Sequence, residues 1–191
     1  MSGYDSWDSL YAKLTICQDC PLHKNRTHVV PGEGDPEAAV LFVGEGPGRE
    51  EDQSGRPFVG RSSHMLDMML ASIQLDRKKV YIANVVKCRT PESRMPMPEE
   101  AEPCLTYLRA QIQLIQPKII VCLGATATKY LFDPGATVNR ERGMWKYADG
   151  VWMLATYHPA ALLRNQARKE AAWEDMKKLQ EKIHELRKSQ E

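Results

Sequence analysis

The sequence has few of the features that mark membrane, secreted or strongly charged proteins. Its longest apolar runs, such as Ile119–Leu123, fall far short of the roughly 20 residues that a helix needs to cross a bilayer. No basic start leads into an apolar signal segment, so we expect a cytoplasmic protein. The formal net charge is only +1, which gives no global sign of nucleic-acid binding, although basic side chains can still gather around a groove.

Cysteine is also scarce, with five in 191 residues. Because the cytosol keeps thiols reduced, metal ligation or simple burial is expected rather than a disulfide framework. Cys17, Cys20, Cys88 and Cys104 contain one close pair, and four thiols suit either an iron–sulfur cluster or a structural zinc ion. Their spacing does not decide between the two metals. Cys122 lies inside an apolar run and is expected to be a small core residue.

Short apolar runs rich in β-branched residues alternate with segments of helical spacing. The predicted strands occupy residues 39–43, 80–86, 118–123 and 151–155, and the predicted helices residues 62–74, 98–115 and 125–132. This alternation indicates an α/β protein with three layers, α/β/α, around a central four-stranded, mainly parallel sheet. We expect one domain over residues 1–191, with an N-terminal helix and a charged C-terminal helix at about 169–188.

The loops that leave the carboxyl ends of these strands are the expected ligand site. The first strand runs into a glycine-rich turn at residues 44–48, whose small residues let backbone amides approach a ligand. Such a turn also occurs in dinucleotide-binding proteins. That alternative requires an acidic residue at the end of the second strand, where this chain has Asn84 and the apolar residues that follow it.

Three further side chains are candidates for the same edge of the sheet. Phe58 lies between glycines and basic residues, where it either anchors a loop to the core or stacks on a base. Asn84 lies in an apolar strand, and its amide needs either an internal partner or a ligand. His158 follows the fourth strand, and its expected position beside the other two favours a catalytic role over a structural one.

Taken together, these motifs resemble those of the family 4 uracil-DNA glycosylases, the iron–sulfur branch of that superfamily. The resemblance runs from Cys17 to about Arg164. It rests on Gly-Glu-Gly-Pro-Gly at 44–48, Gly-Arg-Pro-Phe-Val-Gly at 55–60, Asn-Val-Val-Lys-Cys-Arg at 84–89, Pro-Met-Pro-Glu-Glu at 96–100 and His-Pro-Ala-Ala-Leu-Leu-Arg at 158–164. No single motif is unique, but their joint occurrence in this order is highly specific.

The resemblance implies an enzyme that flips uracil out of DNA and hydrolyses its bond to deoxyribose. It implies that Phe58 stacks on the base, that Asn84 reads its edge, and that His158 with the backbone amides near Gly46 stabilises the departing uracil anion. Glu45 is included among the uracil contacts. It also implies a structural 4Fe-4S cluster, held by Cys17, Cys20, Cys88 and Cys104.

The resemblance further implies how DNA is held. Leu162 is the expected wedge in the base stack, and Arg56, Arg61 and Arg164 are expected near phosphates. Better-known members of the superfamily orient the water with an Asp at the position of Gly46, so the carboxylate expected to do so here is Glu51 or, failing that, Glu45.

Uracil-containing DNA is the expected partner of a monomeric enzyme, and the sequence indicates no specific replication or repair partner. Two other functions compete with this one. A DNA-binding module with a structural metal would need neither Asn84 nor His158, and a nucleotide-dependent enzyme would use the glycine turn.

Overall fold

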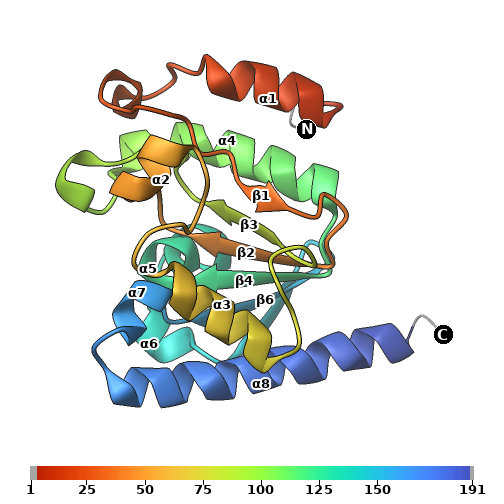
Figure 1. Ribbon diagram of the computed structural model, residues 1–191. Helices are drawn as coiled ribbons and strands as arrows, with labels where there is room; N and C mark the ends of the chain where they lie inside the picture. Colours follow the sequence, from red (N-terminus) through yellow and green to blue (C-terminus); the bar gives the residue numbers. More distant parts are fainter. Residues whose placement is uncertain (1–3, 190–191) are drawn as a thin grey trace.

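A six-stranded sheet forms the centre of the protein in the computed structural model, which describes residues 4–189 (Figure 1). The strand order is β1-β3-β2-β4-β6-β5. The strands are β1 (Glu33–Gly34), β2 (Val40–Gly44), β3 (Tyr81–Asn84), β4 (Ile119–Leu123), β5 (Trp145–Ala148) and β6 (Val151–Thr156). The four central strands, β3, β2, β4 and β6, run parallel and correspond to the four predicted ones.

The prediction of four strands was two too few. Both additional strands lie at the edges and pair antiparallel, β1 with β3 and β5 with β6. β1 has two residues, and β5 is half-buried to exposed along its length. Neither therefore has the apolar run that identifies a strand in the sequence.

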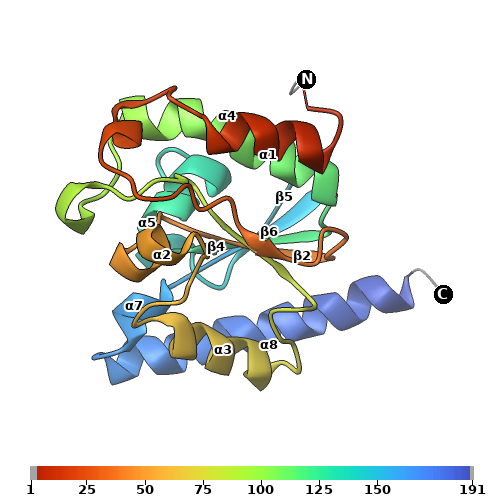
Figure 2. The same cartoon turned by 45° about the horizontal axis from the view of Figure 1, so that its top comes forward.

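Two helices cover each face of the sheet (Figures 1 and 2). On one side lie α1 (Trp7–Thr15) and α4 (Pro98–Ile115), and on the other lie α3 (Ser63–Ser72) and α8 (Gln166–Lys188). The predicted three-layer α/β/α class is confirmed. The shorter helical elements are η1 (Pro21–Lys24), α2 (Arg49–Ser54), η2 (Pro91–Ser93), α5 (Gly124–Ala127), η3 (Thr128–Phe132), α6 (Val138–Glu141) and α7 (Pro159–Leu162).

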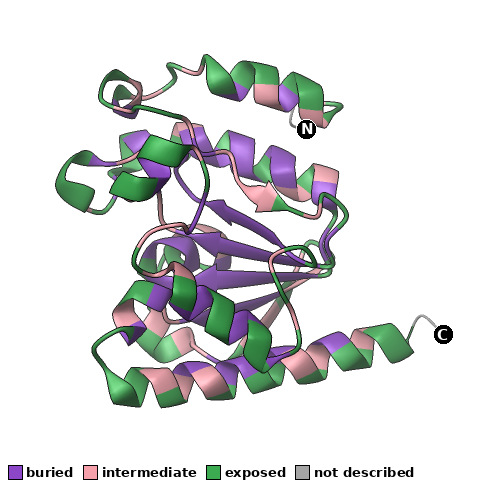
Figure 3. Cartoon of the chain, viewed as in Figure 1, coloured by how far each residue is buried: buried purple, intermediate pink, exposed green. Residues whose placement is uncertain are grey.

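The sheet separates two hydrophobic cores (Figure 3). One core includes side chains of α1 and α4 together with Cys88 and Cys104, and Cys17 and Cys20 pack against it. The other core includes side chains of α3, α7 and α8. Every residue of β2, β3 and β4 is buried. Continuous apolar strands are expected where a parallel sheet is covered on both faces. Within the described residues, no helix is long and apolar enough to cross a membrane.

The C-terminal helix α8 begins three residues before its predicted start and packs through Met176, Leu179 and Ile183 as expected. Its buried face also contains a carboxylate. Asp175 has no exposed surface and accepts hydrogen bonds from the guanidinium of Arg142 at 2.6 and 3.1 Å and from the hydroxyl of Thr156 at 2.7 Å. Asp175 therefore ties α8 to the end of β6, one element before His158.

Replacing Asp175 with alanine should lower the free energy of unfolding by about 1–3 kcal/mol, because the buried Thr156 hydroxyl loses its acceptor. Arg142 is partly exposed and can recover hydration, which limits the loss. Urea denaturation of the variant would measure the effect. The control is Glu174→Ala, which removes an exposed ion pair with Lys177 and should change stability by less than about 0.5 kcal/mol. Equal effects of the two changes would show that burial of Asp175 does not matter.

Candidate active site

A cavity of about 650 Å³ opens at the carboxyl edge of the sheet. It is lined by the loops that follow β2, β3 and β6, together with residues of α2 and of the segment that precedes α3. In Figure 1 this is the end of the sheet where α2, α5 and α7 gather. The position agrees with the ligand site predicted from the sequence, and the structure brings the glycine turn, Phe58, Asn84 and His158 into one lining.

Two glycines allow these side chains to meet. A Cβ atom at Gly44 would lie 2.5 Å from Asn84 Oδ1 and 2.7 Å from the ring of Phe58. At Gly46, a Cβ atom would lie 2.6 Å from a methyl group of Val86. All three distances are too short for a side chain without movement of its neighbours. The glycine-rich turn therefore serves close packing of the cavity wall as well as access to backbone amides.

Phe58 is held in an unusual backbone conformation. Its φ angle is 51°, in the left-handed region that a bulky residue adopts only when its surroundings compensate. Glu51 Oε1 accepts hydrogen bonds from the amides of Val59 and Gly60 at 3.0 and 2.8 Å, and Arg77 donates to the carbonyl of Phe58 at 2.6 Å. These contacts fix the loop and orient the ring of Phe58 toward the cavity. Glu51 thus supports Phe58, a role that the sequence did not predict.

Asn84 is the last residue of β3 and has 2% of its surface exposed. Its side-chain oxygen, Oδ1, is buried and has no hydrogen-bond partner among residues 4–189. Leaving a buried acceptor unpaired is costly, and most such groups in folded proteins are paired. Because Asn84 lines the cavity, a ligand that donates a hydrogen bond is the natural partner. From the sequence, the partner of this amide could have been either another residue of the protein or a ligand. Within the described chain, no residue donates a hydrogen bond to Oδ1.

His158 caps α7 and lies against Phe58, with the two ring centroids 5.4 Å apart and the planes 26° apart. Its Nδ1 accepts a hydrogen bond from the amide of Ala160 at 3.2 Å. Burial lowers the pKa of His158 to about 4, so the ring is neutral at physiological pH. Since Nδ1 is an acceptor, the proton resides on Nε2. Gly124, with φ of 85°, leaves room for the ring, because a Cβ atom there would lie 2.9 Å from His158 Cβ.

Glu45 is half-buried in the cavity wall, and its Oε2 accepts a hydrogen bond from the hydroxyl of Thr126. Thr126 lies in the turn that follows β4, a strand whose loop the sequence had not connected with the site. A small polar residue in a helix-like segment gives no such signal. The contact forms because β4 lies between β2 and β6, which brings the turn after β4 next to the turn after β2.

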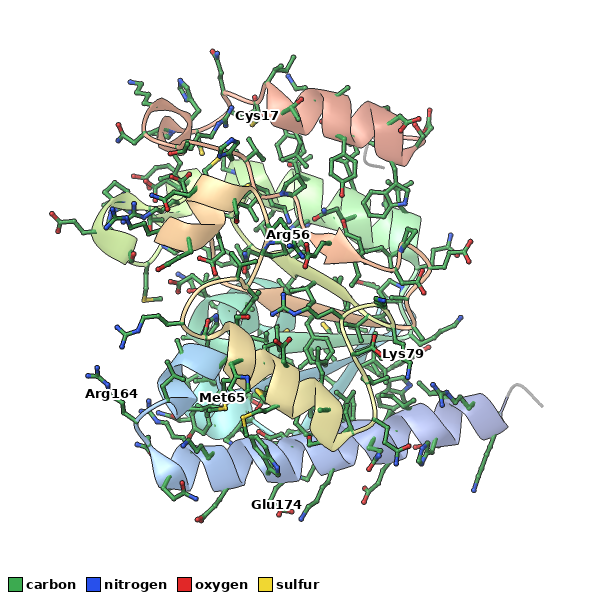
Figure 4. All side chains as sticks on the ribbon, in the orientation of Figure 1. Cys17, Arg56, Met65, Lys79, Arg164 and Glu174 are labelled. Carbon is green, nitrogen blue, oxygen red and sulfur yellow. The ribbon has the colours of Figure 1, made fainter. Side chains whose placement is uncertain are left out.

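The basic residues around the cavity differ in part from those predicted. Arg61, Arg164 and Arg49 are exposed and line the cavity. Figure 4 shows Arg164 projecting outward beyond α7. Arg56 does not belong to the lining formed by the described residues, and its guanidinium is 2.8 Å from the carboxylate of Glu33. The structure therefore gives no support to the prediction that Arg56 lies near the bound strand.

The structure gives no support to the prediction that Leu162 enters the base stack. Leu162 has no exposed surface and packs in the core formed by α3 and α8. The next residue, Leu163, is 39% exposed and lines the cavity. Successive residues of a helix point about 100° apart, so a shift of one position can exchange a core side chain for a surface one. Two adjacent leucines in the sequence do not show which of them faces outward.

The four predicted metal-ligating cysteines line a single enclosed space beside α4. In residues 4–189, no three His, Cys, Asp or Glu side chains converge closely enough to hold one metal ion. Four thiol side chains around one space are the donor set of an iron–sulfur cluster, and also that of a structural zinc ion. Figure 4 places Cys17 at the end of α1, well away from Arg164.

Polar contacts to the sulfur atoms support the same fit. The guanidinium of Arg26 donates to Cys88 Sγ at 3.4 Å, and the amide of Lys87 donates to Cys104 Sγ at 3.2 Å. Burial raises the pKa values of both thiols, that of Cys104 to about 12, so a thiolate is stable there only with cationic compensation. Such N–H···S contacts are typical around iron–sulfur clusters. Cys122 is fully buried inside β4 and away from this space, as predicted.

The model of the uracil DNA glycosylase superfamily matches residues 31–177, a stretch that contains the whole sheet and every residue of the cavity lining. The fold and the cavity described above therefore define a member of the uracil DNA glycosylase superfamily.

Individual relatives narrow the assignment. The chain is 43% identical to the type-4 uracil-DNA glycosylase of Archaeoglobus fulgidus over 185 residues, which cover 93% of each chain. It is 46% identical to the type-4 enzyme of Thermotoga maritima over 157 residues, 81% of this chain and 82% of the relative. Identity to the type-5 uracil-DNA glycosylase of Pyrobaculum aerophilum is 33% over 195 residues, 85% and 86% of the two chains. The chain belongs to the type-4 uracil-DNA glycosylase family, which confirms the resemblance seen in its motifs.

Proposed function

We propose that this protein removes uracil from DNA by hydrolysing the bond between the base and deoxyribose, which leaves an abasic site. The observation that carries the proposal is the unpaired, buried Oδ1 of Asn84 in the cavity of a type-4 family member. Uracil N3–H is a donor and would pair with Oδ1, while the amide N–H group of Asn84 would donate to uracil O4. Cytosine presents the opposite pattern at both positions, so the same amide would exclude it.

Bond cleavage leaves negative charge on the departing uracil. We propose that His158 donates its Nε2 proton in a hydrogen bond to uracil O2, and that this bond strengthens as the charge develops. The amide of Gly46 lies in the same lining and is a second donor. Phe58, whose ring already faces that of His158, supplies the apolar surface on which the base stacks. Glu45, which also lines the cavity, would contact the base or sugar.

The attacking water needs a carboxylate. Both backbone amides that donate hydrogen bonds to Glu51 bind its Oε1 atom. Its Oε2 atom lies beside Gly48, where an added Cβ atom would be 2.6 Å from Oε2. We assign the water to Oε2, so Glu51 would support the Phe58 loop with one oxygen and orient the water with the other. Glu45, already bonded to Thr126, is the second candidate.

DNA would be held at the rim of the cavity by Arg49, Arg61 and Arg164. Leu163 takes the role of wedge that the sequence gave to Leu162. We further propose that the protein acts as a monomeric single domain in the cytoplasm, which is supported by the sequence and by the sheet shared between both cores.

Incubation of the purified protein with a uracil-containing oligonucleotide, followed by alkaline cleavage at abasic sites, tests the proposal directly. Strand breaks at uracil alone are expected. Binding without breaks would favour a DNA-binding module, and no interaction with DNA would favour a nucleotide-dependent function of the glycine turn.

Replacing Leu163 with alanine should slow excision from double-stranded DNA by about tenfold and have little effect on single-stranded DNA, where no base pair has to be broken. Single-turnover rates on both substrates would measure this. Leu162→Ala is the matched control, and it should lower stability because it leaves a cavity in the core. If both substrates slow equally in Leu163→Ala, the side chain is not a wedge.

We also propose that Cys17, Cys20, Cys88 and Cys104 hold a 4Fe-4S cluster. When bound, the cluster would supply a covalent link between the N-terminal arm, the segment after β3 and α4. Purified protein should contain about four irons per chain. Cys88→Ser should lose iron and melt at a lower temperature, whereas Cys122→Ser should keep its iron. One zinc and no iron in the wild-type protein would contradict the assignment.

A further inference from the structure

Lys87 is a buried charged residue, and none of the roles described so far explains why its side chain is buried. We propose that Lys87 is a positioning residue for base recognition, which holds the backbone of Asn84 so that the Asn84 amide faces the cavity. The inference rests on the proposed function, because it assigns the recognition of uracil to that amide.

The side chain of Lys87 turns back toward the end of β3. Only 1% of the residue is exposed, although lysine is normally among the most exposed residue types. Its Nζ donates to the backbone carbonyl of Asn84 at 2.8 Å and to Gln111 Oε1 at 2.6 Å. Burying an ammonium group is costly unless it is well paired, so these two contacts are expected to be strong and specific.

The carbonyl of Asn84 needs such a donor because no strand covers it. The amide of Val85 donates to Gly44 of β2, so the Asn84 carbonyl points to the opposite side of β3, toward β1. In the described chain, β1 pairs with β3 only at Tyr81 and Ile82 and does not extend alongside Asn84. Lys87 therefore supplies the hydrogen bond that a neighbouring strand supplies elsewhere in the sheet.

The partners of Lys87 are themselves fixed. Gln111 lies in α4 with no exposed surface, and its Nε2 donates to the carbonyl of Pro31 at 2.8 Å. The backbone of Lys87 accepts from the amide of Val30 at 2.8 Å and donates to Cys104 Sγ at 3.2 Å. The carbonyl of Asn84 is thus tied through one ammonium group to a helix and to the chain segment at residues 30–31.

The other side of Asn84 is confined as well. Its Oδ1 lies against Gly44, where even a Cβ atom would come within 2.5 Å. The amide is therefore limited on its cavity side by β2 and on its backbone side by Lys87. A displacement of about 1 Å in a group that positions a substrate can lower a rate by about 10²-fold. We infer that loss of the Lys87 contact would allow β3 to relax at its end and move the amide out of register with the base.

Lys87→Met tests the inference, because methionine has a similar length and no donor. We expect the single-turnover rate on uracil DNA to fall about 10- to 100-fold and binding of free uracil to weaken by about tenfold. Affinity for uracil-free DNA of the same sequence should stay within about twofold, because Lys87 is buried and does not line the cavity rim.

Two companion variants separate positioning from general damage. Tyr107→Phe removes the bond between Tyr107 and Asp19 at 2.6 Å, which disturbs the surroundings of the cysteines without touching the Lys87 contacts, and should leave free-uracil binding unchanged. Gln111→Leu removes one of the two partners of Nζ and should reproduce the Lys87→Met loss in weaker form, whereas Gln111→Glu keeps an acceptor and should stay near wild type. Iron content and melting temperature are recorded for each.

The inference is overturned if Lys87→Met keeps wild-type binding of free uracil and a wild-type rate. It is equally overturned if rate and binding are lost only in proportion to iron or folded protein, since Lys87 would then be structural. Should Lys87→Met fail to fold, the comparison of Gln111→Leu with Gln111→Glu decides, and equal behaviour of those two variants would reject the inference. Failure of the proposed function looks different, because the wild-type protein itself would then release no uracil.

Discussion

Replacing His158 with alanine should lower the single-turnover rate of uracil release by about 10²- to 10³-fold while DNA affinity stays near that of the wild type. The expected loss is large because the hydrogen bond from Nε2 strengthens only as negative charge develops on the departing base. Burial and the contact of Nδ1 with the amide of Ala160 keep this ring neutral and oriented before the base arrives. Rapid-quench measurements with excess enzyme would give the rate, and titration of uncleaved DNA the affinity.

Arg164→Ala is the contrasting variant. Arg164 is exposed at the rim, so its loss should weaken DNA binding and reduce the salt dependence of binding by about one unit, with a smaller effect on cleavage once DNA is bound. If His158→Ala weakens binding without slowing the bound enzyme, His158 is a DNA contact. The catalytic role would then move to Glu51 and the amides around Gly46.

The lowered pKa of His158 also has a pH signature. The folded pKa is about 4 and the unfolded value about 6.5, so the folded ring stays neutral while the unfolded ring gains a proton as the pH falls. The free energy of unfolding therefore falls as the pH decreases from about 6.5 to 4, because only the unfolded state gains this proton. Cleavage by bound enzyme should show no loss from protonation of this ring between pH 8 and about 5. A decline centred near pH 6.5 that disappears in His158→Ala would contradict the assignment.

Asn84→Asp should lower uracil excision by about 10²-fold or more and shift the remaining activity toward cytosine. A carboxylate cannot donate to uracil O4, and a protonated carboxyl group could donate to cytosine N3. Sites built around specific hydrogen bonds lose much of their activity when a buried polar group is left mismatched. Single-turnover assays on oligonucleotides that contain uracil or cytosine at one position would measure the ratio of the two rates.

A control for Asn84→Asp is Phe58→Ala, which should weaken capture of either base by about 1–3 kcal/mol without changing the preference between them. Full uracil activity in Asn84→Asp would show that the unpaired Oδ1 is not the recognition atom. The Lys87 variants would then lose their expected effect as well.

The sequence identified those parts of the fold that carry strong local patterns. The residues of β2, β4 and α4 follow from continuous apolar runs and from a proline with two acidic residues in the first helical turn, and α4 has the predicted bounds. The edge strands β1 and β5 could not be predicted in this way. β1 depends on pairing with β3, which lies far along the chain, whereas β5 forms a hairpin with β6 through the turn at Asp149 and Gly150. Neither edge strand buries a continuous face.

The residues of the candidate site also differ in how far the sequence could identify them. Phe58, Asn84 and His158 could be found because their residue types are unusual for their predicted surroundings, and the structure brings them together. Lys87 and Thr126 were not found, because a lysine and a threonine are ordinary at an exposed position and only burial makes them notable. The exchange of Leu162 for Leu163 depended on the direction of a four-residue helix, which no periodicity can define.

The division of the molecule into two cores also matters for protein engineering. The cysteines and the loop of residues 158–164 belong to cores on opposite sides of the sheet. Substitutions that are distant and share no partners usually contribute additively to stability. A designer could therefore introduce stabilising substitutions along α3 and α8 and judge them by melting temperature alone, without re-optimising the layer that contains the thiols.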